Sequence, residues 1–138
     1  MPPALVAYWD AWNEPDAVAV RRHLEVAVDD HVEWNDPRDS FVGRVELEAA
    51  VQRLHASKPE YRFVIASEID HHHSRYRYRW DMVRGSRVLM EGTDIVTISG
   101  VSGRITRIDG FFGDVTPLKE IDSGVPATHR RQTNRTGA

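Results

Sequence analysis

Two strands joined by a glycine-rich turn, between Val88 and Gly113, constrain the fold of this chain more than any other stretch. Side chains alternate between the two faces of a strand. One face of the first strand is apolar or glycine with a single exception, Asp94, and consists of Val88, Met90, Gly92, Asp94, Val96 and Ile98. In the second strand Ile105 and Ile108 are out of phase, which predicts a bulge or twist near Thr106. We therefore expect a concave apolar sheet face with one carboxylate pointing into it.

That carboxylate, Asp94, needs an explanation. Burying an unpaired charge is costly, so such a group either finds hydrogen-bonding partners or takes up a proton. Asp94 is therefore expected to have a partner or a chemical role. The alternative is an exposed position at the end of its strand.

Composition limits the class of protein. A chain of 138 residues with 41% hydrophobic content suits one compact domain. It has no cysteine, which excludes disulfides and thiolate metal sites. The net charge of -3 argues against general nucleic-acid binding. No apolar run has membrane-spanning length and the N-terminus lacks a leader pattern, so we expect a cytoplasmic protein without membrane contact.

Helical spacing predicts three helices before the long strands. The first spans residues 4–13, the second runs from Pro15 to about Val28, and the third lies between Val45 and Lys58. A short strand, residues 30–36, and a polar loop, residues 37–43, separate the second and third helices. The core-facing positions predicted for the first two helices are Leu5, Tyr8, Trp9, Trp12, Val18, Leu24 and Val28.

Two further strands follow, at residues 61–72 and 75–83. In the second, arginine alternates with aromatic residues: one face carries Arg75, Arg77, Arg79 and Asp81, and the other carries Tyr76, Tyr78, Trp80 and Met82. Either face can point inward, and the pattern alone favours the aromatic face.

These elements predict an α+β domain over residues 1–121. Its cone-shaped, curved antiparallel sheet has four long strands and one short strand, packed on about three N-terminal helices. Residues 122–138 are polar and rich in arginine, and are predicted to form a disordered tail.

Several short motifs occur in a characteristic order across residues 4–118. They are Trp12-Asn13 with Asp16, Asn35-Asp36-Pro37, Gly43, His71-His72, Arg77 with Trp80, Gly92-Thr93-Asp94, Gly103-Arg104-Ile105 and Gly110-Phe111-Phe112-Gly113. In this respect the chain resembles the nuclear transport factor 2-like superfamily, and within it SnoaL-like and ketosteroid isomerase-like domains. The resemblance implies a cone-shaped α+β barrel and cofactor-independent chemistry on a small molecule.

The resemblance to ketosteroid isomerases implies three catalytic residues. Asp36 matches the general base, Tyr8 the hydroxyl donor on the first helix, and Asp94 the protonated acid on the penultimate strand. A base of this kind removes a proton beside a carbonyl while the donors hold the enolate oxygen. In the same register Arg77 and Arg79 point into the cavity, where they would keep Asp94 ionised.

A second implication comes from limonene epoxide hydrolases, which use an Asp-Arg-Asp arrangement. Arg79 and Asp81 match its first part, but the nearest acid on the last strand, Asp109, is one residue out of phase and would need a bulge to face the site. Other residues expected to line or orient the pocket are Trp12, Trp34, His71, Met90, Ile108 and Phe112.

Simpler interpretations stay open for several of these residues. Asp36 can cap the turn before Pro37, and Arg77, Arg79 and Asp81 can form ion pairs on the outer face of the sheet. Of the three consecutive histidines, 71–73, at most two share a face, so no metal site is predicted.

Three functions therefore remain possible: an isomerase, cyclase or dehydratase with epoxide hydrolysis as a variant, a non-catalytic ligand-binding domain, and a dimerising domain with a filled cavity. Exposed aromatic residues on the strand at residues 75–83 would favour a homodimer through the sheet. An open cavity touching both Asp36 and Asp94 would favour the first two functions.

Overall fold

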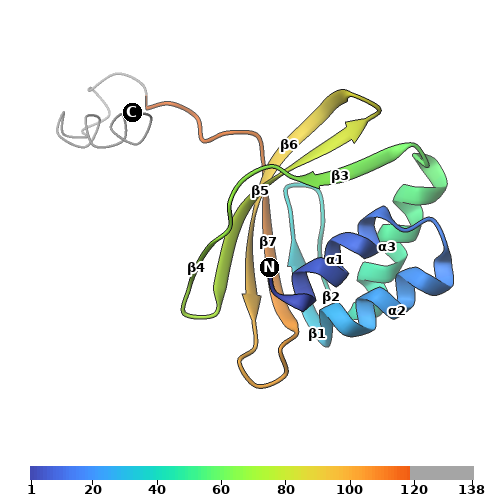
Figure 1. Ribbon diagram of the computed structural model, residues 1–138, viewed down its shortest axis with the longest axis vertical. Coiled ribbons are helices and arrows are strands. Elements are labelled where there is room, and N and C mark those ends of the chain that lie inside the picture. Colours follow the sequence, from blue (N-terminus) through green and yellow to red (C-terminus); the bar gives the residue numbers. More distant parts are fainter. Residues whose placement is uncertain (119–138) are drawn as a thin grey trace.

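The computed structural model describes residues 1–118 of the chain. Three helices lie on one side of a curved, open sheet of seven strands, as Figure 1 shows. This arrangement confirms the predicted α+β cone. The tail predicted at residues 122–138 lies outside the described residues.

The helices are α1 (Pro3–Asn13), α2 (Ala17–Ala27) and α3 (Arg44–Ser57). Asp16 caps α2, because its carboxylate accepts a hydrogen bond of 3.0 Å from the Ala19 backbone N–H. The predicted core position Val18 is wrong, since its side chain is exposed. The buried stripe of α2 follows the i, i+4, i+7 spacing of Val20, Leu24 and Ala27 instead.

The strands are β1 (Val28–Asn35), β2 (Ser40–Val42), β3 (Tyr61–Ile65), β4 (Asp70–His72), β5 (Arg75–Arg84), β6 (Arg87–Ile98) and β7 (Ile105–Phe112). Their order in the sheet is β2-β1-β7-β6-β5-β3, and β4 also pairs with β5.

The sheet differs from the expected one in three respects. It is mixed rather than wholly antiparallel, because β1 runs parallel to β7. The polar loop at residues 37–43 contains β2, which pairs with β1. The strand expected at residues 61–72 is divided into β3 and β4. Each difference concerns pairing between strands, which the local alternation of side chains does not specify.

Two bulges set the register of the central strands. One lies at Thr106, as predicted: Thr97 pairs with Arg107 while Ile98 pairs with Ile105. The other was not foreseen, and lies at Leu89 in the hairpin between β5 and β6. There Val83 pairs with Val88 but Met82 pairs with Met90, so that Leu89 has no partner residue. Beyond this bulge Tyr78 lies directly opposite Asp94.

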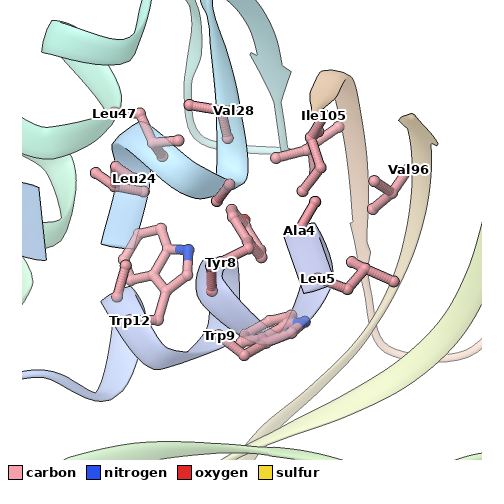
Figure 2. Packing of buried hydrophobic residues seen from close by; sticks show 14 of the residues in the cluster. Ala4, Leu5, Tyr8, Trp9, Trp12, Leu24, Val28, Leu47, Val96 and Ile105 are labelled. Atoms are coloured by element: carbon pink, nitrogen blue, oxygen red, sulfur yellow. The ribbon is translucent and has the colours of Figure 1, made fainter. Parts of the chain in front are cut away.

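The core lies between the helices and the concave face of the sheet. Figure 2 shows Tyr8 and Trp12 of α1 in a cluster with Leu24 of α2, Leu47 of α3 and Ile105 of β7. None of the helices in the described part of the chain combines the length and the apolar character that crossing a membrane requires.

The aromatic face of β5 points into this core. Tyr78 is 1% exposed and Trp80 is 4% exposed, whereas Arg75 and Arg77 lie on the exposed side of the strand. The side-chain pattern therefore predicted the inward face of β5 correctly.

Candidate active site

A cavity of about 250 Å³ remains in the concave face of the sheet. Its walls come from α1, α3, β1 and the central strands, and its polar lining includes Tyr8, Asp36 and Asp94. The predicted pocket residues that also line it are Trp12, Trp34, Met90, Ile108 and Phe112. Because side chains do not fill this cavity, a dimerising domain with a filled cavity is the least suitable of the three functions.

Asp94 lies deep in this cavity, with a side chain held by two neutral donors. The Trp80 indole N–H donates to Asp94 Oδ1 over 2.9 Å, and the Tyr78 hydroxyl donates to Oδ2 over 3.1 Å. The Tyr78 oxygen in turn accepts a hydrogen bond of 3.0 Å from the Trp9 indole. The expectation that Asp94 has hydrogen-bonding partners is thereby confirmed.

Burial raises the pKa of Asp94 from its ordinary 3.8 to about 7. The hydrogen bonds from Trp80 and Tyr78 lower this pKa in part, and the negative charge of Asp36 raises it further. Near neutral pH the group is therefore present both as the acid and as the carboxylate, as a residue that exchanges protons with a substrate requires.

Tyr8 is positioned as a donor. Its hydroxyl oxygen accepts a hydrogen bond of 3.0 Å from the Trp34 indole N–H. Burial, followed by the charge of Asp94, raises the pKa of Tyr8 well above its ordinary value, so that the hydroxyl keeps its proton. No residue among 1–118 accepts that proton, which leaves it available to a ligand oxygen.

Asp36 combines a structural contact with a place in the cavity wall. Its Oδ1 atom accepts hydrogen bonds of 2.8 Å from the backbone N–H groups of both Arg38 and Asp39, which confirms that it caps the turn after β1. Its Oδ2 atom makes no hydrogen bond within residues 1–118. One oxygen therefore fixes the side chain and the other is left for chemistry.

Gly110 of β7 lets Asp36 and Asp94 approach each other. A methyl group at this position would lie 3.0 Å from Asp94 Oδ1 and 3.6 Å from the Asp36 Cβ atom. The absence of a side chain thus keeps open the space that separates the two acids.

The arginines and the acid expected to line the pocket from β5 lie on the outer face of the sheet instead. Arg77 forms an ion pair with Asp70, and Arg79 forms one with Asp114. Asp81, two residues further along, lies on the same side as Arg79. The cavity positions that the resemblance implied for these three residues are wrong, and the Asp-Arg-Asp arrangement is absent from the described cavity lining.

The bulge at Leu89 is the physical reason. Counted from the turn without a bulge, Arg77 would pair with Asp94 and the two would share a face. The extra residue moves the register by one position and places Tyr78 opposite Asp94.

Two other predicted residues also lie away from the cavity. His71 stacks on Tyr76, with ring centroids 4.3 Å apart, where β4 pairs with β5. Asp109 accepts hydrogen bonds from Asn35 over 3.2 Å and from Arg107 over 2.8 Å, on the face opposite to Ile108. The bulge that would have turned Asp109 inward does not occur at that position.

Sequence reasoning missed the residues that hold Asp94 and those at the cavity mouth. The sequence places Trp9 in the core, and Tyr78 and Trp80 on a face that lines a pocket or forms a dimer surface, but it does not identify them as partners of Asp94. Arg38 and Arg53 also line the cavity, and no local pattern distinguished them from the other arginines.

No family sequence model matches the chain, and no curated protein sequence matches it. Among solved structures, a proposed isomerase of the SnoaL-like family from Agrobacterium tumefaciens is similar at 28% identity, with a TM-score of 0.74, over 80% of this chain and 95% of that one.

Two more distant structures share the fold. A proposed ketosteroid isomerase from Kribbella flavida is 12% identical, with a TM-score of 0.61, over 91% of this chain and 87% of the other. An LEH-like epoxide hydrolase from M. tuberculosis is 14% identical, with a TM-score of 0.59, over 81% of each chain.

Proposed function

We propose that this chain, which has the fold of the nuclear transport factor 2-like superfamily, is a cofactor-independent acid-base enzyme. Its substrate would be a small hydrophobic molecule with a carbonyl group or a ring, and its reaction an isomerisation, cyclisation or dehydration. The observation that supports this proposal most is the convergence of Tyr8, Asp36 and Asp94 on one cavity.

In the proposed reaction, the Asp36 carboxylate removes a proton from a carbon next to the substrate carbonyl. The electron pair moves to the carbonyl oxygen, which becomes an enolate. Hydrogen bonds from the Tyr8 hydroxyl and from the protonated form of Asp94 stabilise that oxygen. Return of the proton from Asp36 to another carbon completes an isomerisation.

Epoxide hydrolysis is the weaker variant of this proposal. It would need an arginine and two acids around one water molecule, as the resemblance implied. Arg79, Asp81 and Asp109 lie outside the cavity lining, so those residues do not support it.

A second candidate function, non-catalytic ligand binding, is favoured by one observation. The side chain of Asp36 already caps a turn through two backbone N–H groups. A purely structural Asp36 would leave the cavity as a binding site without a base.

Proton exchange in deuterated water distinguishes these functions without knowledge of the substrate. A panel of small cyclic ketones is followed by proton NMR for loss of the signals next to the carbonyl. We expect the wild type to catalyse exchange and Asp36→Asn to slow it by about 100-fold or more. The asparagine oxygen can still cap the turn, so folding should be preserved. Arg77→Gln, on the outer face, is the matched control and should exchange at the wild-type rate.

The pH profile tests the role of Asp94. Exchange should decline as the pH rises above about 7, because the proton that Asp94 donates is then lost. Exchange that is equally fast in Asp36→Asn and the wild type would contradict the base assignment. Ketones that bind without any exchange would favour the non-catalytic function.

The homodimer through the sheet remains a proposal, and its original reason no longer holds. Tyr78 and Trp80 fill the cone and are not exposed on the outer face. The large apolar side chains exposed along the strands are Val42, Val64, Val88, Ile95 and Phe111. Light scattering at micromolar concentration tests the proposal, and a mass of 15.8 kDa would contradict it.

A further inference from the structure

We propose that the ligand of this cavity carries a carboxylate, which Arg38 and Arg53 hold at the mouth. This inference rests on the proposed function in one respect, namely that the cavity receives a small molecule. It goes further in naming a charged group on that molecule and the direction in which the molecule enters.

Arg38 is held in place at the mouth by two contacts. Its backbone N–H donates to Asp36 Oδ1 in the turn that follows β1. Its guanidinium carbon lies 5.3 Å from the centroid of the Phe112 ring, which is a cation–π arrangement over a residue of the cavity wall. The charge is therefore directed to the rim of the cavity and not to bulk solvent alone.

Arg53 reaches the same cavity from α3. This helix borders the cavity with residues at i, i+3, i+4 and i+7, which are Ala50, Arg53, Leu54 and Ser57. Small and apolar neighbours on this stripe leave Arg53 as its only charged side chain. The two guanidinium groups thus come from separate elements of the fold.

Neither arginine is neutralised by an acid within residues 1–118. Other arginines are neutralised in this way, since Arg77, Arg79 and Arg107 each form ion pairs on the outer face of the sheet. Arg38 and Arg53 are also the only arginines among the residues that line the cavity. They are therefore available to a ligand.

The acids that line the cavity differ in burial and in their position relative to Arg38 and Arg53. Asp94 lies deep and is partly protonated near neutral pH, and the Asp36 carboxylate lines the cavity as well. Asp39 also lines the cavity, beside Arg38 in the sequence, and opposes the arginines. Arg38 and Arg53 are exposed whereas Asp94 is buried, so the positive charge of the cavity lies on its solvent side.

This distribution sets the orientation of the ligand. The walls below the mouth are aromatic, so a ring enters among the indoles while the carboxylate stays between the arginines. In that orientation the interior part of the ligand faces Tyr8 and Asp94, where the proposed chemistry takes place.

Isothermal titration calorimetry with two matched compounds tests the inference. The probes are 2-naphthoate and 2-naphthamide, which share their shape but differ in charge. We expect the wild type to bind the acid about tenfold more tightly than the amide at low salt. Arg38→Gln and Arg53→Gln should each weaken acid binding by about threefold to tenfold and leave amide binding unchanged.

Two further variants make the test specific. Asp39→Asn should strengthen acid binding by about twofold, because it removes the opposing charge. Arg77→Gln, on the outer face, should change neither affinity. All these positions are solvent-accessible, so the variants are expected to fold.

Equal affinity for the two compounds overturns the inference, as does acid binding that is unchanged in both arginine variants. In either case the amide still occupies the cavity, and the proposed acid-base function is unaffected. If the wild type binds neither compound, the carboxylate inference is contradicted, whereas the ketone exchange assay decides the acid-base function by itself.

Discussion

The two faces of strands β5 and β6 hold charge in opposite ways. On the inner face a single carboxylate, Asp94, is buried and its donors are the neutral side chains of Tyr78 and Trp80. On the outer face charges are numerous, exposed and paired with charges, as in Arg77 with Asp70. Successive residues of one strand supply both arrangements.

This difference predicts which substitutions change the free energy of unfolding most. Exposed ion pairs contribute about 0–1 kcal/mol each, because water screens them. The buried carboxyl group is more sensitive to mutation of its neighbours, because removing one donor leaves an unsatisfied buried group that costs about 1–3 kcal/mol. The four predictions below test this contrast, from the largest expected effect to the smallest.

The largest effect is expected from Gly92→Ala on the inner face. A methyl group at Gly92 would overlap the Trp80 ring and lie 2.7 Å from the Phe111 carbonyl oxygen. Trp80 would have to move and release Asp94, at a cost of more than about 3 kcal/mol. Urea denaturation measures this loss. Gly100→Ala, where a methyl group has no neighbour within 4 Å, is the control and should be nearly neutral.

Tyr78→Phe should cost about 2–3 kcal/mol of unfolding free energy. It leaves the Trp9 N–H without an acceptor and one oxygen of Asp94 without a donor. The pKa of Asp94 should also rise further, because the lost hydrogen bond lowers it. Tyr76→Phe is the matched control, since the Tyr76 hydroxyl makes no hydrogen bond within residues 1–118. Equal stability of the two variants would contradict the network around Asp94.

Stability should also fall as the pH rises from about 4 to about 7. Over this range Asp94 of the unfolded chain ionises near its ordinary pKa of 3.8, while the folded protein retains the proton up to about 7. The folded state therefore binds more protons than the unfolded state, and its stability decreases with pH. We expect a loss of about 3 kcal/mol. In Asp94→Asn this loss should be absent, and an identical pH slope in variant and wild type would refute the assignment.

The smallest effect is expected on the outer face. Arg77→Gln removes an ion pair whose two side chains are both 65% exposed. Its unfolding free energy should stay within about 0.5 kcal/mol of the wild type. A loss comparable to that of Tyr78→Phe would remove the distinction between the two faces.

Much of this contrast was predictable from the sequence, because alternation along a strand is a local property. It predicted Asp94 among apolar neighbours on the inner face of β6, and the inward aromatic face of β5. The phase change between Ile105 and Ile108 predicted the bulge at Thr106. The resemblance correctly grouped Tyr8 and Asp36 with Asp94 around one cavity.

What escaped prediction depends on pairing between strands. The parallel contact of β1 with β7 joins segments far apart in the chain, and no local signal specifies it. The bulge at Leu89 has no glycine or phase change to mark it, yet it decides whether Arg77 or Tyr78 lies opposite Asp94. Without that bulge, Arg77, Arg79 and Asp81 would share the face of Asp94 in place of Tyr78 and Trp80.

The walls of the cavity give the protein a built-in optical reporter. The chain has four tryptophans, and all of them, Trp9, Trp12, Trp34 and Trp80, line the cavity. Tryptophan emission from the folded protein therefore originates entirely at the candidate site. Any molecule that displaces water from the cavity should change the intensity or wavelength of that light, so ligands can be sought without a label and before any reaction is known.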